Sequence, residues 1–253
     1  MHEIKITQSN IRTDVISEKN SKNNHSYFIE ENGLKIEKQS HYTIIHFKDI
    51  TDYNNYKQVQ VELIKQLKEY IKIDKNDQIL VIGLGNEKST PDSLGPMTID
   101  KVLVTRYLYM LGEVEEGYSN VCSFTPNVMG NTGIETSDLI KSVIVQTKVT
   151  KVIVIDSLRT NTLSHLIKTI QITDQGIYPG SGIGNSRKEI SKKNMNVEVI
   201  AIGVPTIIEY QTKDTSIMVT PTDIDYLIEK LSILIGDSLN IIFHKNYNRH
   251  IYR

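Results

Sequence analysis

The sequence predicts an α/β fold with a mainly parallel sheet and helices on both faces. Three short apolar runs carry this prediction: "QILVIGLG" from Gln78, "KVIVIDS" from Lys151 and "VEVIAIGVPT" from Val197. Such runs are typical of strands that are buried on both sides. Stretches with helical spacing separate them, and strands that alternate with helices favour a parallel sheet.

Residues 15–77 are expected to add an arm, a small β-rich portion and a helix. The polar stretch from Ile16 to Tyr27 is predicted to be a loop or arm, because it has little apolar surface to bury. "LKIEKQSHYTIIHF" from Leu34 has the composition and partial alternation of one or two antiparallel strands. "NYKQVQVELIKQLKEYI" is predicted to be a helix. Its expected apolar face comprises Val59, Val61, Leu63, Ile64, Leu67 and Ile71.

Residues 78–253 are expected to form the core of the sheet and its helices. After the first strand, "PMTIDKVLVTRYLYML" is predicted to be one helix with Pro96 in its first turn. "YSNVCSFTP" is predicted to be a strand and "TGIETSDLIKSVIVQT" a second helix. The last helix, "TDIDYLIEKLSILIGDSLNIIF", is expected to have Thr222 or Asp223 as its N-cap.

The composition is that of an ordinary soluble globular protein. Of 253 residues, 39% are apolar and 23% charged, and the net charge of -1 offers no bulk attraction to nucleic acid or an anionic membrane. No apolar run approaches the roughly 20 residues that span a bilayer, and the N-terminus is polar, so an intracellular protein is expected. The single Cys122 excludes an intramolecular disulfide and a CxxC site.

Two aspartates follow apolar strands at positions where a parallel sheet forms its binding crevice. Asp92 lies in the loop after the first strand, and Asp156 is expected to end the strand that begins at Lys151. The carboxyl ends of parallel strands share one edge of the sheet, so the two side chains are expected to meet there. A single Asp at such a place can also be a turn or helix cap.

A close pair of carboxyl groups has a specific chemistry. Two carboxylates repel when both ionise, so the pair tends to keep one proton and can supply a base and an acid at the same pH. The ionised member would take a proton from water, and the protonated member would polarise the carbonyl or donate to the departing amine. Amide hydrolysis would then need no covalent nucleophile.

The two glycine-rich loops match nucleotide-binding patterns poorly. "GLGNEK" has Gly83 and Gly85 but Lys88 where a dinucleotide fold needs a third glycine, and Asp92 would repel a pyrophosphate. "YPGSGIGNSRKEI" lacks the G-K-[ST] of a P-loop. Gly180, Gly182 and Gly184, which are followed by Arg187 and Lys188, are expected either to form a tight turn or to hold an anion through backbone amides.

Cysteine and metal chemistry have less support in the sequence. Cys122 lies in a strand-like segment and is expected to be a small buried apolar residue. The seven histidines include no H-E-x-x-H motif. A metal bound by Asp92, Asp156 and His165 stays open as an alternative, although no cofactor is expected.

Five segments together resemble the germination protease of spore-forming bacteria, an atypical aspartic peptidase family. They are "VIGLGNEKSTPDSLGPMTIDKVLVTRYL", "PNVMGNTGIETSDLI", "VIVIDSL", "IQITDQGIYPGSGIGNSRKEIS" and "VIAIGVPT", joined by "VTPTDIDYLI" and the N-terminal "IRTDV". The resemblance implies a fold similar to hydrogenase maturation proteases. It also implies that Asp92 and Asp156 are the catalytic aspartates, with Gly85, Asn86 and the Gly180–Gly182 loop lining the crevice.

The resemblance further implies a zymogen and a substrate. Residues 1–14 would be a propeptide removed by self-cleavage between Asp14 and Val15, which leaves a single peptidase domain of residues 15–253. The substrates would be small acid-soluble spore proteins, and the enzyme would act as a homotetramer in the cytoplasm of the forespore and spore core. No direct contact with nucleic acid or membrane is implied.

One departure from the family pattern keeps other functions open. After "VPTIIEYQTKDTS" the chain passes almost at once to "IMVTPTDIDYLIEKL", where the family usually carries a long additional segment. The missing segment lies outside both aspartates and the glycine loop. The alternatives are a non-catalytic sporulation protein with the same fold and a metal-assisted maturation-type protease.

Overall fold

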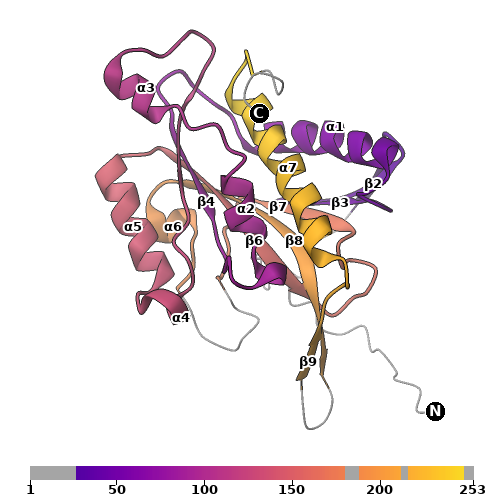
Figure 1. Cartoon of the computed structure of the whole chain (residues 1–253). Coiled ribbons are helices and arrows are strands. Elements are labelled where there is room, and N and C mark those ends of the chain that lie inside the picture. Colours follow the sequence, from indigo (N-terminus) through magenta and orange to yellow (C-terminus); the bar gives the residue numbers. More distant parts are fainter. Residues whose placement is uncertain (1–26, 180–187, 212–215, 248–253) are drawn as a thin grey trace, which may run out of the picture.

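The computed structural model describes residues 27–179, 188–211 and 216–247, which form one nine-stranded sheet with helices (Figure 1). The strands are β1 (Tyr27–Glu31), β2 (Leu34–Gln39), β3 (Tyr42–His46), β4 (Gln78–Gly83), β5 (Asn120–Phe124), β6 (Lys151–Thr160), β7 (Thr169–Thr173), β8 (Glu198–Gln211) and β9 (Ser216–Val219). The helices are α1 (Tyr53–Tyr70), the short 3-10 helix η1 (Thr90–Asp92), α2 (Leu94–Ile99), α3 (Arg106–Leu111), α4 (Met129–Thr132), α5 (Thr136–Thr147), α6 (Lys192–Met195) and α7 (Ile224–Phe243).

The sheet is mixed. Its order is β1-β2-β3-β7-β8-β6-β4-β5, with β9 paired to β8. Pairing is parallel between β5, β4, β6 and β8, and antiparallel elsewhere. The predicted α/β fold is confirmed, but parallel pairing is confined to these four strands. The N-terminal strands β1, β2 and β3 join the same sheet through the pairing of β3 with β7. Short turns connect β1 to β2 and β2 to β3, so the chain reverses and these strands pair antiparallel.

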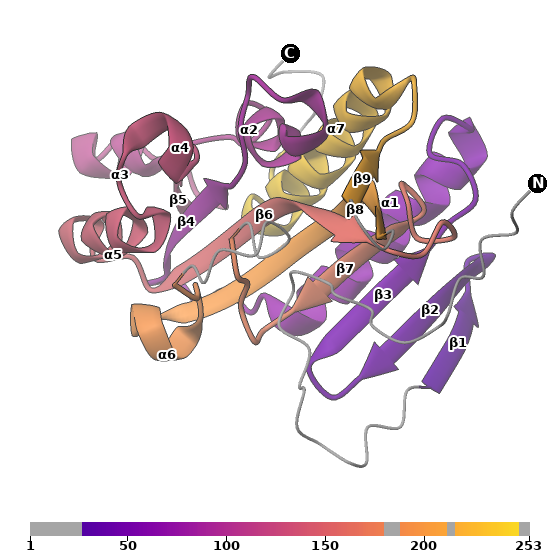
Figure 2. The ribbon, with the colours of Figure 1, turned by 90° about the horizontal axis from the view of Figure 1, so that it is seen from below.

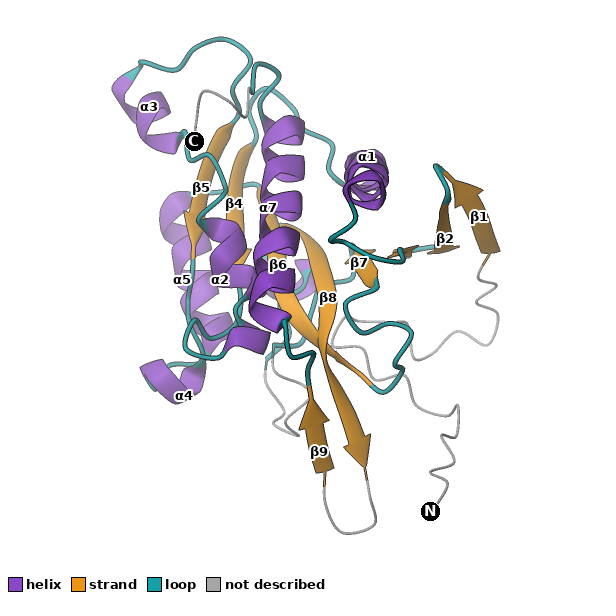
Figure 3. Cartoon of the chain, turned by 45° about the vertical axis from the view of Figure 1, so that its right-hand side comes forward, coloured by secondary structure: helices purple, strands orange, loops and turns teal. Residues whose placement is uncertain are grey.

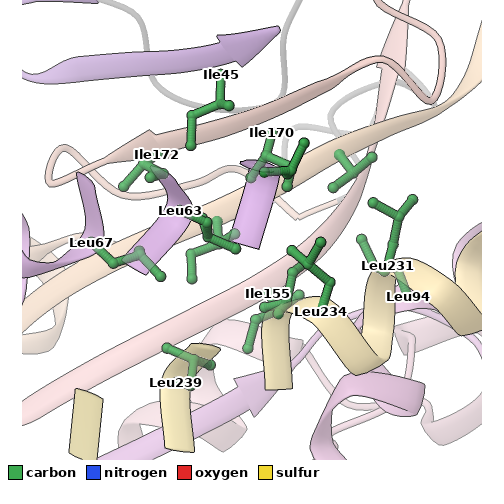
Figure 4. Close-up of a cluster of buried hydrophobic side chains, with 14 of the residues drawn as sticks. Ile45, Leu63, Leu67, Leu94, Ile155, Ile170, Ile172, Leu231, Leu234 and Leu239 are labelled. Atoms are coloured by element: carbon green, nitrogen blue, oxygen red, sulfur yellow. The ribbon is translucent and has the colours of Figure 1, made fainter. Parts of the chain in front are cut away.

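Both faces of the parallel strands are buried, as the apolar runs predict. In β4, Ile79 and Val81 belong to one hydrophobic cluster and Leu80 and Ile82 to another. Helices α1, α2 and α7 cover the first face, and α5 and α6 cover the second (Figure 2). Figure 4 shows the first cluster, where side chains of α1 and α7 meet those of the sheet.

Helix α1 forms where the helical spacing predicts it, with one difference on its apolar face. The Asp52 side chain accepts a hydrogen bond from the Asn55 N–H and caps the helix. Val59, Leu63 and Leu67 are buried, but Val61 is 56% exposed. A helix turns about 100° per residue, so Val61 faces away from the stripe that begins at Val59.

The prediction of a single helix after β4 is wrong. The chain forms α2 and α3, with a break between Asp100 and Thr105. The Thr105 N–H donates to the Val121 carbonyl (3.0 Å), and Thr105 Oγ1 accepts from the Val121 N–H (3.1 Å). Pairing with the edge of β5 therefore replaces the helical bonds at this point.

The last helix begins as predicted, with Asp223 at its N-cap position, although the cap makes no side-chain hydrogen bond there. None of the helices in residues 27–179, 188–211 and 216–247 has the length and apolar character needed to cross a membrane.

Candidate active site

The loop that carries Asp92 folds back onto the end of β4. The Leu84 N–H donates to the Ile155 carbonyl of β6 (2.8 Å), which fixes the start of this loop beside β6. Gly85 has φ +119°, and a Cβ there would lie 2.0 Å from the Asp92 carbonyl oxygen. The same oxygen accepts a hydrogen bond from the Asn86 N–H (2.9 Å). Only glycine permits this close approach of the two backbone segments.

Helix η1 is also tied to β8. Thr206 Oγ1 donates to the carbonyl of Pro91 (2.6 Å), the residue before Asp92. Thr206 is fully buried and lies at a β-bulge, where Leu158 pairs with Pro205 but Arg159 pairs with Ile207. A bulge leaves one residue outside the ladder and redirects its side chain. Here the residue is Thr206, and its hydroxyl reaches η1.

Asp156 lies within β6, so the prediction that it ends this strand is wrong. Beyond Asp156, β6 continues to Thr160, because β8 runs beside it and pairs with it throughout. The side chain is 4% exposed, and its Oδ1 accepts a hydrogen bond from the Ser157 N–H (2.9 Å). The last pair between β4 and β6 is Gly83 with Ile155. The carboxylate of Asp156, one residue beyond the last pair between β4 and β6, thus accepts a hydrogen bond from the next amide of β6.

These contacts bring the segments of both aspartates to one edge of the sheet. Helix η1 packs against β6 and β8 at the carboxyl ends of the parallel strands. Gly85 and Asn86, which were predicted to line this edge, both contact the backbone of Asp92. The geometry therefore places Asp92 and Asp156 on neighbouring segments, one half-buried in a fixed turn and the other buried in a strand.

A group of asparagines joins the loops after β4 and β5. Asn131 Nδ2 donates to Asn86 Oδ1 (3.1 Å) and to Asn127 Oδ1 (2.8 Å). Asn127 has φ +63°, a conformation that Asn tolerates better than most residues. Asn127, Asn131 and Thr206 were not predicted from the sequence. The proline within the β8 run was the available signal for Thr206, because proline inside a sheet marks an edge or a bulge.

Other predicted site residues lie outside the part of the chain that the structure describes. These are Asp14 and Val15 at the predicted cleavage point and Gly180, Ser181 and Gly182 of the second glycine loop.

The metal site of Asp92, Asp156 and His165 does not form. Across the described ranges, no three His, Cys, Asp or Glu side chains gather closely enough to hold a metal ion. The His165 ring instead lies 5.6 Å from the His46 ring between centroids, and its Nδ1 is buried without a hydrogen-bond partner. His165 therefore belongs to the junction of the β6–β7 loop with β3.

Burial gives His165 an effect on stability. Desolvation, and then the neighbouring His46, lower the pKa of His165 from its ordinary value of about 6.5. As the pH falls below that value, the unfolded chain binds this proton before the folded chain does, so stability is lost.

We expect His165→Phe to reduce the fall in melting temperature between about pH 7.5 and about pH 5.5, because the variant has no imidazole to protonate there. Thermal melts at both pH values measure this difference. The comparison variant is His41→Phe, because the His41 side chain is 44% exposed and its Nδ1 lies 3.0 Å from Asp174 Oδ1, so that its loss should not reduce the fall. An equal fall in wild type and His165→Phe would contradict the expectation.

Cys122 lies in strand β5, but it is only partly buried, where full burial was predicted. Its thiol is half-buried, and Sγ donates weakly to the Ile79 carbonyl (3.6 Å). Burial raises the pKa of the thiol, which disfavours the thiolate that a nucleophile requires.

Comparison with known proteins identifies the family. The sequence profile described as germination protease matches residues 1–216. The chain is 41% identical to the germination protease of Oceanobacillus iheyensis over 210 residues, which are 79% of this chain and 56% of that protein. It is 47% identical to that of Bacillus subtilis over 163 residues, 64% of this chain and 43% of the relative. The chain thus spans about half the length of the curated relatives it matches.

Among solved structures, the [NiFe] hydrogenase maturation protease HycI from Thermococcus kodakarensis is similar to this chain, with a TM-score of 0.41 and 16% identity. The match covers 69% of this chain and 99% of HycI. The family itself rests on the sequence matches, because the profile covers most of the chain. By these matches, the chain belongs to the germination protease family.

Proposed function

We propose that this chain is an endopeptidase that uses Asp92 and Asp156 to activate water. The observation that carries the proposal is the packing of η1, which bears Asp92, against β6, which bears Asp156. One carboxylate would take a proton from water while the water oxygen attacks the scissile carbonyl. The protonated partner would then give its proton to the departing amine, so that the C–N bond breaks and the pair ends with one proton again.

Family membership supports a narrower proposal for substrate and processing. The substrate is a small acid-soluble spore protein, degraded during germination in the cytoplasm of the spore core. The chain is made in the forespore as a zymogen that removes residues 1–14 by cutting between Asp14 and Val15, and it assembles as a homotetramer. The test is incubation of the chain, whole or trimmed at Asp14, with such a spore protein, followed by mass spectrometry of the products. Intact substrate after incubation with the trimmed chain would contradict the proposal.

The direct passage from "VPTIIEYQTKDTS" to "IMVTPTDIDYLIEKL", where the family usually carries a long additional segment, supports a second candidate, a non-catalytic protein that binds the same substrate. Binding of a spore-protein peptide without turnover would favour this candidate.

For the enzyme, we expect EDTA to leave the cleavage rate unchanged, because the proposed reaction uses two carboxyl groups alone. Loss of activity with EDTA and its recovery with added metal would instead support a metal-assisted protease.

Removal of the Thr206 hydroxyl should affect catalysis more than stability. We expect Thr206→Val to lower kcat about tenfold, because η1 loses its bond to β8 and Asp92 is held less firmly. The lost hydrogen bond itself is worth about 1 kcal/mol of unfolding free energy. Steady-state kinetics and urea denaturation measure the two effects.

A control is Thr173→Val on β7, which removes the bond from Thr173 Oγ1 to the His41 carbonyl (2.7 Å) and the bond that Oγ1 accepts from the Gln175 N–H (3.1 Å). It should cost at least as much stability and leave kcat unchanged. Equal kcat values for Thr206→Val and wild type would show that this bond does not position Asp92.

A further inference from the structure

The outer edge of β9 is an unprotected strand edge beside the candidate active site. In the described part of the chain, β9 pairs with β8 alone, and the β8–β9 hairpin extends away from the rest of the sheet (Figures 1 and 3). Three consecutive side chains of β9 are exposed: Ile217 by 51%, Met218 by 56% and Val219 by 44%. Successive strand residues point to opposite faces, so the hairpin is apolar on both sides of this edge.

The other two edges of the sheet carry charge or a covering segment. At β1, Tyr27, Phe28 and Ile29 are also exposed, but Glu30 and Glu31 place charge at the edge, and Glu31 forms an ion pair with Lys65. At β5, Val121 exchanges hydrogen bonds with Thr105 in both directions. Charged residues and covering segments are the usual means of preventing unwanted pairing. The sequence of β9, "SIMV", has neither a charge nor a proline.

Hydrogen bonds connect the base of this hairpin to the candidate active site. Thr220, directly after β9, donates through Oγ1 to the carbonyl of Thr206 (2.9 Å). Thr206 in turn donates to the carbonyl of Pro91, next to Asp92. A chain that paired with β9 would therefore lie along a strand whose base adjoins η1.

We propose that the outer edge of β9 binds an extended segment of the protein substrate by strand addition and holds it beside Asp92 and Asp156. This inference rests on the proposed peptidase function. Main-chain hydrogen bonds would supply affinity, and Ile217, Met218 and Val219 would favour apolar side chains on the added segment. A second copy of the chain fits this edge less well. A four-residue strand provides too little area for a stable dimer, which buries about 800 Å² on each partner.

The test is the variant Met218→Lys, because lysine on a strand edge opposes pairing. We expect kcat/KM for the intact spore protein to fall about tenfold or more through KM, as the loss of one or two main-chain bonds would give. A short peptide that covers only the scissile bond should be cleaved at an unchanged rate. The control, Val61→Lys, places the same charge at a side chain of equal exposure (56%) on α1. Unchanged KM for the intact substrate in Met218→Lys would overturn the inference.

A binding measurement separates this inference from the proposed function. Fluorescence anisotropy of a labelled spore-protein peptide is measured with the Asp156→Asn protein, with and without Met218→Lys, and again with the peptide N-methylated at alternate residues. Weaker binding with Met218→Lys and with the N-methylated peptide supports strand addition. This holds even if the wild-type protein never cleaves the peptide, a result that would refute only the peptidase. Unchanged binding overturns strand addition even if cleavage occurs. A lower oligomer mass for Met218→Lys in analytical ultracentrifugation, with both substrates affected alike, would instead assign the edge to contacts between copies and overturn the inference.

Discussion

Asp92→Asn and Asp156→Asn should each lower the cleavage rate by roughly a thousandfold or more, within the range expected when a general acid or base is lost. Asparagine keeps the shape of the side chain but can neither accept the proton of water nor donate to the departing amine. The expected loss is in kcat, because neither change removes a surface that binds the substrate. The measurement is the time course of spore-protein cleavage, followed by mass spectrometry.

The control for this experiment is Asp237→Asn in α7. Asp237 is also 4% exposed, and it accepts a hydrogen bond from the Tyr247 hydroxyl (3.1 Å). The change replaces a buried carboxyl group by an amide at a second place, so it reports the effect of that replacement on folding alone. Melting temperatures of all three variants show whether they remain folded. Cleavage at the wild-type rate by a folded Asp92→Asn or Asp156→Asn protein would exclude the carboxyl pair as the catalytic group.

Gly95→Ala should destabilise the protein by about 3 kcal/mol, near the upper end of the cost of overpacking. A Cβ on Gly95 would lie 2.1 Å from the Leu84 carbonyl oxygen and 2.7 Å from the Ile155 oxygen. Both neighbours are backbone atoms, so α2 would have to move away from β4 and β6. Because η1 directly precedes α2, this movement would also displace Asp92 and abolish cleavage.

Gly130→Ala in α4 is the control for Gly95→Ala. Among the described residues, apart from the chain neighbours and the backbone of α4 itself, no atom lies within 4 Å of a Cβ built at Gly130, so we expect little change in stability. Urea denaturation midpoints of the two variants and wild type provide the comparison. Similar midpoints for Gly95→Ala and wild type would mean that the contact between α2 and the two strands is looser than the structure indicates.

The sequence predicted the parallel core well, because its strands are buried on both faces and leave a continuous apolar signal. It also predicted that Asp92 and Asp156 would lie at one edge, since this follows from strand direction alone. The sequence could not predict which segments would pair beyond the core. Thr105 leaves the helical pattern to bond with Val121, a residue 16 positions away. Local spacing carries no information on such a contact.

The contacts that support the site could not be predicted from the sequence for the same reason. The hydrogen bond from Thr206 to Pro91 joins residues 115 positions apart. It requires the bulge at Thr206, and that bulge is set by the register of β6 and β8. Likewise, Asp156 was expected at the end of a strand because the apolar run stops there. The strand continues because β8 offers main-chain partners, and such pairing does not require apolar side chains.

The position of Asp156 inside a paired strand determines how the distance between the two carboxyl groups can vary. Its backbone cannot shift without breaking the ladder between β6 and β8, whereas Asp92 belongs to a turn that is anchored by individual hydrogen bonds. If the proposed removal of residues 1–14 changes this distance, we expect the backbone change on the Asp92 side. Amide hydrogen exchange of the whole and the trimmed chain should then differ in residues 85–92, while β6 stays equally protected in both.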